Sequence, residues 1–378
     1  GEELVEFKIS REEFLKGLQK VQGIVDTKGA MPILSNILIK TQPSGIDIFA
    51  TDLDIGIKGS YGAKRISEGS ATVSGRKLHE IVRELPDEEI HLKSDKENNW
   101  INITCKKSTF KIACLPAEEY PAFPAYKEEK DLCIEIDLLK EMLRKTNFSI
   151  STDETRYTLN GVLLESEGKD ISMVGTDGHR LACIKKSNGF DKKDKVEIII
   201  PKKAQAELLK ILEAGDSDQG NGKKTINISV EKNHAAFKVD KMILVTRLID
   251  GRFPNYRQVI PEDNNNNVVI DSELFLHALR RVAILADEKS RMVKFGVQKN
   301  LMTLVSDNSE LGEAREEIDV EYKGNDITIG LNAKYVMDIL NVINVEKIVF
   351  KLKDADSSCL ITPTDNENYR CIVMPMRI

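Results

Sequence analysis

The residues best suited to chemistry stand together in one short stretch, Gly175–Ala182, which reads GTDGHRLA. Asp177 and His179 could act as a general base with its orienting carboxylate, or as ligands of a metal ion. Either role needs further partners, and the sequence offers none at a catalytic or metal-binding spacing. The same residues also suit a tight turn between two apolar strands, because Asp-Gly favours turns. The alternatives are therefore a cytosolic hydrolase or metal enzyme centred on Asp177 and His179, and a hairpin with a hydrogen-bonded His179 and an exposed Arg180.

The composition is that of an ordinary globular protein, with 41% hydrophobic and 31% charged residues. A chain of 378 residues predicts two or three domains, each able to bury its own core. No apolar run approaches the roughly 20 residues that cross a bilayer, and no signal peptide precedes Val5. The six cysteines contain no CxxC pair and the five histidines form no ligand spacing with them. We therefore expect buried thiols, a reducing cytoplasm, no membrane contact, and neither a metal nor a cofactor.

The elements that must position the turn follow a repeating order of one strand, one helix and three strands. Ser10 should cap the first helix, with Glu13 completing a capping box. The six predicted helices are Arg11–Gln22, Arg76–Leu85, Leu138–Asn147, Lys202–Leu212, Leu274–Ile284 and Ala333–Ile343. Around the turn, the pattern predicts separate short strands over Leu159–Glu165, Ile171–Val174, Leu181–Ile184 and Val196–Ile200. The sequence thus predicts an α+β protein of three repeated domains, each of two β-α-β-β-β units and about 126 residues long.

Charge is divided unevenly between the helices and the rest of the chain. The net charge of −6 argues, taken alone, against a nucleic-acid partner. The six predicted helices, however, contain 15 Lys or Arg and 7 Asp or Glu, so they carry about +8 and the remainder about −14. Six solvated helix faces would be an alternative explanation, but five of the six helices lean basic. We therefore expect one positive helical surface on an acidic body, which would attract phosphate without reading bases.

Three motifs, in the right order, spacing and repeat unit, are similar to one family. The sequences TDGHRLA, LIDGRFPNYRQVIP and VMPMRI resemble the bacterial sliding clamp, the beta subunit of DNA polymerase III; they are Thr176–Ala182, Leu248–Pro261 and Val373–Ile378. The resemblance extends over the whole chain through MPILSNILI, TDLDIGI and YTLNGVLLE, which are Met31–Ile39, Thr51–Ile57 and Tyr157–Glu165.

The resemblance implies a DNA-clamp fold, in which two three-domain protomers form a head-to-tail homodimeric ring. Basic helices would line the hole and sheets would form the outside, with domains over residues 1–130, 131–261 and 262–378. Such a ring encircles double-stranded DNA without sequence specificity and catalyses no reaction. It would act as the processivity factor of the replicative polymerase. Its implied partners are the polymerase catalytic subunit, the clamp loader, and other DNA polymerases or repair proteins that carry short peptide motifs.

The resemblance also implies a partner-peptide pocket on the second domain and the C-terminal tail. Its residues would be Leu159, Thr176, Gly178, His179, Arg180, Leu181, Pro254, Val259, Val373, Met374, Pro375, Met376 and Arg377. Methionine adapts to different partners, proline gives a rigid apolar wall, and Arg180 would offer a forked donor at the rim. The tail should pack beside the hairpin and leave a groove between Leu181, Pro254 and Met374. Gln258 stands where some relatives have a basic residue, so the resemblance does not carry over a charged rim contact there.

Two further sets of residues follow from the resemblance. Phosphate and sugar contacts are implied for Lys28, Tyr157, Lys202 and Lys203. At the dimer seam, Ile284 and Leu285 would meet Phe110 and Ile112 of the other protomer, although all four could instead be ordinary core residues. A repeat-built adaptor that binds proteins but no DNA is a third possible function.

Overall fold

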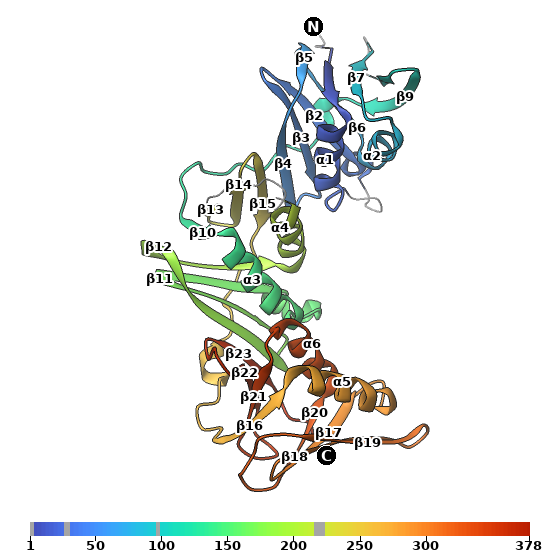
Figure 1. Ribbon diagram of the computed structural model, residues 1–378. Helices are drawn as coiled ribbons and strands as arrows, with labels where there is room; N and C mark the ends of the chain where they lie inside the picture. Colours follow the sequence, from blue (N-terminus) through green and yellow to red (C-terminus); the bar gives the residue numbers. More distant parts are fainter. Residues whose placement is uncertain (1–3, 26–30, 96–98, 215–223) are drawn as a thin grey trace. The chain divides into compact units, whose positions relative to one another are not determined.

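The computed structural model describes residues 4–25, 31–95, 99–214 and 224–378, except for the side chains of residues 189–194. The chain forms two compact units (Figure 1). Unit 1 comprises Gly1–Ile136 and Lys203–Leu248, and unit 2 comprises Asp137–Lys202 and Ile249–Ile378.

Unit 1 is built on one sheet of 13 strands. In spatial order these are β10 (Leu132–Glu135), β13 (Thr225–Glu231), β14 (His234–Val239), β15 (Met242–Arg247), β4 (Ile55–Gly62), β3 (Gly45–Thr51), β2 (Asn36–Gln42), β6 (Ser70–Ser74), β9 (Ser108–Leu115), β8 (Trp100–Cys105), β7 (Glu89–Ser94), β1 (Glu6–Ser10) and β5 (Lys64–Ser67). Helices α1 (Arg11–Val21) and α2 (Gly75–Glu84) pack side by side against this sheet. Helix α4 (Lys202–Ala214) also belongs to unit 1, except for its first residue, Lys202, which is in unit 2. Helix α1 buries Phe14, Leu18 and Val21, as its helical spacing predicts.

The start of α1 is only partly as predicted. Ser10 Oγ accepts a hydrogen bond from Glu13 N at 3.3 Å, so the N-cap is confirmed. The Glu13 carboxylate instead accepts from the backbone amide of Gly62 at 3.4 Å. The reciprocal half of the predicted capping box is therefore wrong, because a neighbouring strand supplies the donor.

Unit 2 contains two sheets and the helices α3 (Ile136–Thr146), α5 (Ser272–Val282) and α6 (Ala333–Ile343). The six-stranded sheet has the order β11 (Gly161–Thr176), β12 (Arg180–Pro201), β23 (Tyr369–Val373), β22 (Cys359–Pro363), β21 (Lys347–Leu352) and β16 (Asn266–Asp271). The four-stranded sheet has the order β19 (Gly312–Asp319), β18 (Leu301–Asn308), β17 (Met292–Gln298) and β20 (Ile327–Asn332). The rings of Phe275, Phe295 and Phe350 pack at centroid distances of 5.9 to 6.1 Å within the core of this unit.

The strands around the Asp-Gly turn are longer than predicted. The segments predicted as Leu159–Glu165 and Ile171–Val174 belong to the single strand β11, and those at Leu181–Ile184 and Val196–Ile200 belong to β12. The polar residues between them suggested loops, but the backbone stays paired and absorbs the irregularity as shifts in register near Gly168. The turn therefore stands at the end of a long two-stranded ladder.

Strand pairing also continues across the predicted domain boundaries. Strand β15 pairs with β4, and β12 pairs with β23, so each junction is part of a continuous sheet. Most of the predicted central domain is therefore shared between the units: β10, α4 and β13–β15 lie in unit 1, and α3, β11 and β12 lie in unit 2.

Candidate functional site

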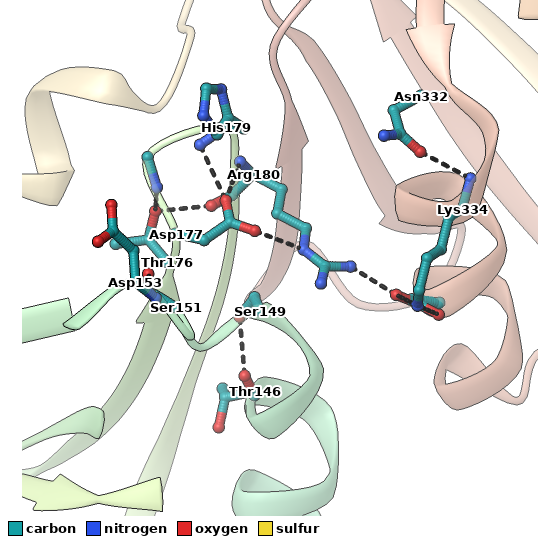
Figure 2. Close-up of polar contacts among 12 residues, drawn as sticks. Thr146, Ser149, Ser151, Asp153, Thr176, Asp177, His179, Arg180, Asn332 and Lys334 are labelled. Atoms are coloured by element: carbon teal, nitrogen blue, oxygen red, sulfur yellow. Dashed lines mark hydrogen bonds and ion pairs between the residues drawn. The ribbon is translucent and has the colours of Figure 1, made fainter. Parts of the chain in front are cut away.

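The turn between β11 and β12 is held by one carboxylate (Figure 2). Asp177 Oδ1 accepts from the backbone amides of His179 at 2.9 Å and Arg180 at 3.0 Å, and its Oδ2 accepts from Arg180 Nε at 3.0 Å. Thr176 Oγ1 donates to the Arg180 carbonyl at 2.6 Å and accepts from the Gly178 amide at 3.1 Å. Asp177 is thus occupied as the organiser of a tight turn.

Gly178 is required by this geometry. Its φ of +88° lies in the left-handed region, where side chains are strained. A Cβ atom there would also stand 2.5 Å from Nη1 of Arg156, whose guanidinium donates to the Asp177 carbonyl at 3.3 Å. We therefore expect glycine alone to fit this position without rearrangement.

Arg180 is buried, contrary to both predictions made for it. Only 9% of its side chain is exposed, so it is neither a surface residue nor a free forked donor at a pocket rim. Its Nη1 donates to Asp338 Oδ2 at 2.6 Å, and Lys334 Nζ binds the same carboxylate at 2.7 Å (Figure 2). The guanidinium carbon also lies 4.3 Å from the ring centroid of Tyr335. Two carboxylates and an aromatic face fix this cation between the turn and α6.

The enzyme hypothesis finds no support in this arrangement. Both oxygens of Asp177 are engaged by the turn and by Arg180, while His179 is exposed. Among the described residues, no group of three or more His, Cys, Asp or Glu is placed to hold a metal ion. The geometry at the turn is that of a rigid structural corner.

The C-terminal tail is bound at both ends of its apolar segment. The Met374 amide donates to the His179 carbonyl at 2.9 Å, and the Met376 amide donates to the Gly330 carbonyl at 2.7 Å. Met374 is 40% exposed, and Pro375 and Met376 are half-buried. The prediction that the tail packs beside the hairpin is confirmed, and the tail also reaches β20.

Beside the tail lies a buried apolar cluster. Its members come from both strands of the turn, from the C-terminal strands and from the segment after β15: Leu159, Leu163, Val174, Leu181, Cys183, Ile199, Phe253, Tyr256, Leu360 and Ile372. Leu159 and Leu181 are only 7% and 4% exposed, so they form a floor, while Pro254, Val259 and Met374 present exposed apolar surface. Arg377, the last predicted pocket residue, is exposed.

Val373 lies on the other face of its strand from this apolar cluster. Leu181 pairs with Ile372, and Arg180 pairs with Val373, so Val373 shares the face of Arg180. Because side chains alternate along a strand, Ile372 is the residue that joins the cluster. Sequence reasoning also missed Phe253, Tyr256 and Leu360, although the alternation of residues in Tyr369–Val373 could have identified Ile372.

The short 3₁₀ helix η6 (Tyr256–Val259) carries one edge of this apolar surface. The Tyr256 hydroxyl donates to Glu165 Oε2 at 2.7 Å, and Arg257 Nη2 donates to the same oxygen at 2.8 Å. Burial, followed by the hydrogen bond to Glu165, raises the pKa of the Tyr256 hydroxyl, which therefore stays a donor. The buried hydrogen bond between Tyr256 and Glu165 fixes the position of η6, and with it Val259.

The predicted DNA contacts have different surroundings. Lys28 lies outside the described residues. Tyr157, in the 3₁₀ helix η4 (Glu154–Leu159), is 58% exposed, and Lys202 is exposed at the start of α4. Lys203 forms an ion pair with Asp52 in unit 1.

The helices carry a smaller positive excess than expected. The observed boundaries add Asp137, Glu213 and Glu273, so the six helices hold 15 basic and 10 acidic residues. Several helix cations also pair within their own helix, including Lys77 with Glu80 at 2.8 Å and Lys145 with Glu141 at 2.7 Å. The helices still carry a net positive charge, while the rest of the chain is net negative.

The four predicted seam residues include two large exposed apolar side chains. In unit 1, Phe110 and Ile112 lie opposite Ile103 and Ile101 on the core-facing side of β9, yet Phe110 is 37% exposed. In unit 2, Ile284 is 73% exposed and Leu285 is half-buried in the 3₁₀ helix η7 (Ala283–Leu285). The alternative that all four are ordinary core residues is therefore wrong for Phe110 and Ile284.

None of the helices in the described part of the chain is long and apolar enough to cross a membrane.

Comparison with known proteins agrees with the fold. Three family models match in order: the N-terminal, central and C-terminal domains of the DNA polymerase III beta subunit, over residues 5–124, 133–255 and 257–377. The chain is 32% identical to the beta sliding clamp of Pseudomonas aeruginosa and 33% identical to that of Vibrio cholerae. The alignments cover 98% and 99% of this chain and 100% of each relative.

A solved sliding-clamp structure has the same fold as this chain. The sliding clamp of Pseudomonas aeruginosa bound to griselimycin superposes with a TM-score of 0.92 at 32% identity, over 100% of both chains. The matching of three domains over the full length, together with this structural likeness, shows the family. The chain belongs to the bacterial DNA polymerase III beta subunits, the beta sliding clamps.

Proposed function

We propose that two copies of this chain form a head-to-tail ring around double-stranded DNA in the bacterial cytoplasm. The ring would tether the catalytic subunit of the replicative polymerase, the clamp loader, and other DNA polymerases or repair proteins. It contributes no catalysis to the holoenzyme, because its work is topological. The observation that carries the proposal is the ordered match of three clamp domains over the full chain. We place the domain boundaries at 1–130, 131–261 and 262–378.

Ring closure is supported by two incomplete sheet edges. Strand β9 pairs with β6 only at Cys114 and Leu115, so in the described chain its residues 108–113 keep an open edge. Strand β19 is an edge strand of its sheet and carries Glu313, Glu316 and Glu317. The basic residues Lys107 and Lys111 lie beside or within β9, so the two edges are complementary in charge. Pairing them would cover Phe110, Ile112, Ile284 and Leu285.

DNA binding would be electrostatic. The basic helices, with Lys28, Tyr157, Lys202 and Lys203, would contact phosphate and sugar without reading base edges. Such contacts are weak and salt-dependent, which is what a sliding ring requires.

Partner binding would use the apolar surface beside the turn and the tail. Pro254, Val259 and Met374 provide the exposed apolar side chains, and the buried cluster with Leu159 and Leu181 supports them from below. Thr176, Gly178, His179 and Arg180 shape the adjoining turn, and Pro375, Met376 and Arg377 complete the tail. A short peptide could insert two apolar side chains here, with few residues dominating its affinity.

Calorimetry with a short peptide that bears a Gln and a Leu-Phe pair tests this function. We expect binding to the full chain and loss of binding after deletion of Met374–Ile378, with the dimer retained. Griselimycin, which the Pseudomonas aeruginosa clamp binds, should displace the peptide. Equal peptide affinity for both proteins would move the partner site elsewhere, and loss of the dimer would make the tail a structural strand.

A further inference from the structure

Strand β20 lies at the edge of the four-stranded sheet, and among the strands of that sheet it pairs only with β17. Its other edge receives the C-terminal tail. Gly330 and Met376 form an antiparallel bridge there, in which the Met376 amide donates to the Gly330 carbonyl at 2.7 Å. An edge strand presents backbone groups that must be paired or covered. The tail satisfies part of this edge, and Gly330 is the residue at which the two meet.

Gly330 is buried although it faces away from the core of the unit. Its neighbours Ile329 and Leu331 are fully buried in the core, so Gly330 lies on the opposite face of β20. Thr328, two residues earlier on that same face, is exposed. Since the carbonyl oxygen of Met376 lies close against Gly330, we infer that the tail is what covers this glycine.

A side chain at position 330 would collide with the tail. A Cβ atom there would stand 2.9 Å from the carbonyl oxygen of Met376, 3.1 Å from Cγ1 of Ile378 and 3.2 Å from Sδ of Met292. The first of these atoms belongs to the backbone, so it cannot rotate away as the two side-chain atoms can. The φ angle of Gly330 is outside the left-handed region, so the conformation of β20 does not itself require glycine.

Gly296 of β17 offers a direct comparison in the same sheet. It stands between the buried residues Phe295 and Val297, so it also faces away from the core. A Cβ atom on Gly296 would have its nearest neighbours at 3.8 to 3.9 Å, which is ordinary van der Waals contact. Of these two glycines, only Gly330 lacks room for a methyl group, and the closest atom that would exclude the methyl group is in the tail.

The tail connects this contact with the apolar surface of the partner site. The Met374 amide is held by the His179 carbonyl at 2.9 Å, the Met376 amide is held by Gly330, and only Pro375 stands between them. The ring of a proline fixes its φ angle, so this segment has little freedom to absorb a displacement of Met376. Such a displacement would therefore move Met374, whose side chain is 40% exposed beside the buried apolar cluster.

We propose that Gly330 is a positioning residue of the partner site, because its lack of a side chain leaves the room in which the C-terminal tail is seated. The proposal rests on the proposed function, since the seated tail supplies Met374 to the apolar surface. Gly330 acts through the tail and touches no partner itself. Even a methyl group at this position displaces the tail from β20, while the pairing of β17 with β20 stays in place.

The test compares Gly330→Ala with Gly296→Ala and with the wild-type dimer. Hydrogen exchange of the C-terminal fragment, measured by mass spectrometry, reports release of the tail. Calorimetry with the peptide that bears a Gln and a Leu-Phe pair reports partner affinity. In Gly330→Ala we expect the tail amides to exchange about 5-fold faster, as for the loss of one hydrogen bond. The peptide should bind about 5-fold more weakly, because it must also order the released tail.

The control variant Gly296→Ala should match the wild type in both measurements, and exchange within β17 and β20 should stay slow in all three proteins. Unchanged tail exchange in Gly330→Ala would overturn the proposal, since a methyl group would then fit beneath the tail. Faster exchange with unchanged peptide affinity would also overturn it, because the seating of the tail would not matter to the partner. A Gly330→Ala chain that fails to fold would show that the sheet, and not the tail, requires glycine.

Failure of the proposed function gives a different result. If the wild type binds no peptide, the partner pocket is refuted, and the role of Gly330 in that pocket is refuted with it. If the wild type binds the peptide and Gly330→Ala binds it equally well, only the role of Gly330 is refuted.

Discussion

Arg180 and Asp338 are joined by an ion pair of 2.6 Å, although 158 positions separate them in the chain. The pair ties the turn between β11 and β12 to helix α6. The carbonyls of His179 and Gly330 hold the two ends of the tail segment. The Arg180–Asp338 ion pair therefore also sets the distance between the elements that anchor the tail. Arg180 is therefore a positioning residue for the apolar surface.

Replacing Arg180 with Ala should lower the free energy of unfolding by about 3 kcal/mol, because Asp177 and Asp338 lose a buried cation. Peptide affinity should fall as well, since the tail loses its fixed frame. Urea unfolding and calorimetry measure the two effects. Lys334→Gln removes only the exposed partner of Asp338 and should cost less than about 1 kcal/mol. Equal stability of the Arg180→Ala variant and the wild type would show that the pair positions nothing.

Local signals in the sequence predicted much of this fold. Ser10 caps its helix as expected from its side-chain oxygen, and the predicted helix Ala333–Ile343 is observed with the same ends. The predicted repeat of two β-α-β-β-β units per domain requires three strands after the helix that begins the third domain. Strands β17 to β19 occupy this region.

The site depended on information that the local sequence does not contain. The burial of Arg180 requires Asp338 and Tyr335, which only the folded chain brings near. The choice between Ile372 and Val373 depends on the pairing register of β12 with β23. The motifs drew attention to the turn and the tail, but they could not show which of these side chains are buried in the apolar cluster, which are exposed and which hold the turn in place.

The ring seam can be tested by charging its apolar residues. Changing both Ile284 and Leu285 to Asp should give folded monomers, because closure would bury charge without a partner. Sedimentation measures the assembly state. Leu274→Asp charges another exposed leucine, on α5, and should leave the dimer intact. An unchanged dimer in the double variant would remove Ile284 and Leu285 from the interface.

DNA binding should weaken equally for all sequences when Lys28, Lys202 and Lys203 are replaced by Ala. The slope of log affinity against log salt should become less steep by about 0.9 for each phosphate that the variant no longer neutralises. Titrations over a range of salt concentrations measure this. Since Asp52 pairs with Lys203, Asp52→Asn should free that cation and raise DNA affinity. A sequence preference that survives high salt would contradict the sliding mechanism.

Stability should depend on pH through His79 in α2. Burial, followed by the charge of Arg83, lowers the pKa of His79, while Glu80 acts in the opposite direction. The unfolded chain therefore binds this proton more readily, so the fold loses stability as pH falls below about 6.5. Urea midpoints between pH 7.5 and 5 should decline less in His79→Gln than in the wild type. Parallel curves would show that His79 does not contribute.

A second acid effect falls in a separate pH range. Partial burial would raise the pKa of Glu6, but hydrogen bonds from Lys93 and His91 outweigh it and leave this pKa below its usual value. Stability from this group is present above about pH 4.5 and is lost as pH falls through the lowered pKa. Glu6 therefore does not contribute to the loss of stability that we assign to His79 at higher pH.

The most direct test of the ring is retention on closed DNA. The clamp, assembled on a closed circular duplex by a clamp loader, should stay bound through gel filtration in salt that abolishes ordinary electrostatic binding. Cutting the circle once should release it, because only topology holds it there. The seam variant with Ile284 and Leu285 changed to Asp should not be retained on either form. Retention that is unchanged by linearisation would contradict encirclement and favour an adaptor that binds its target directly.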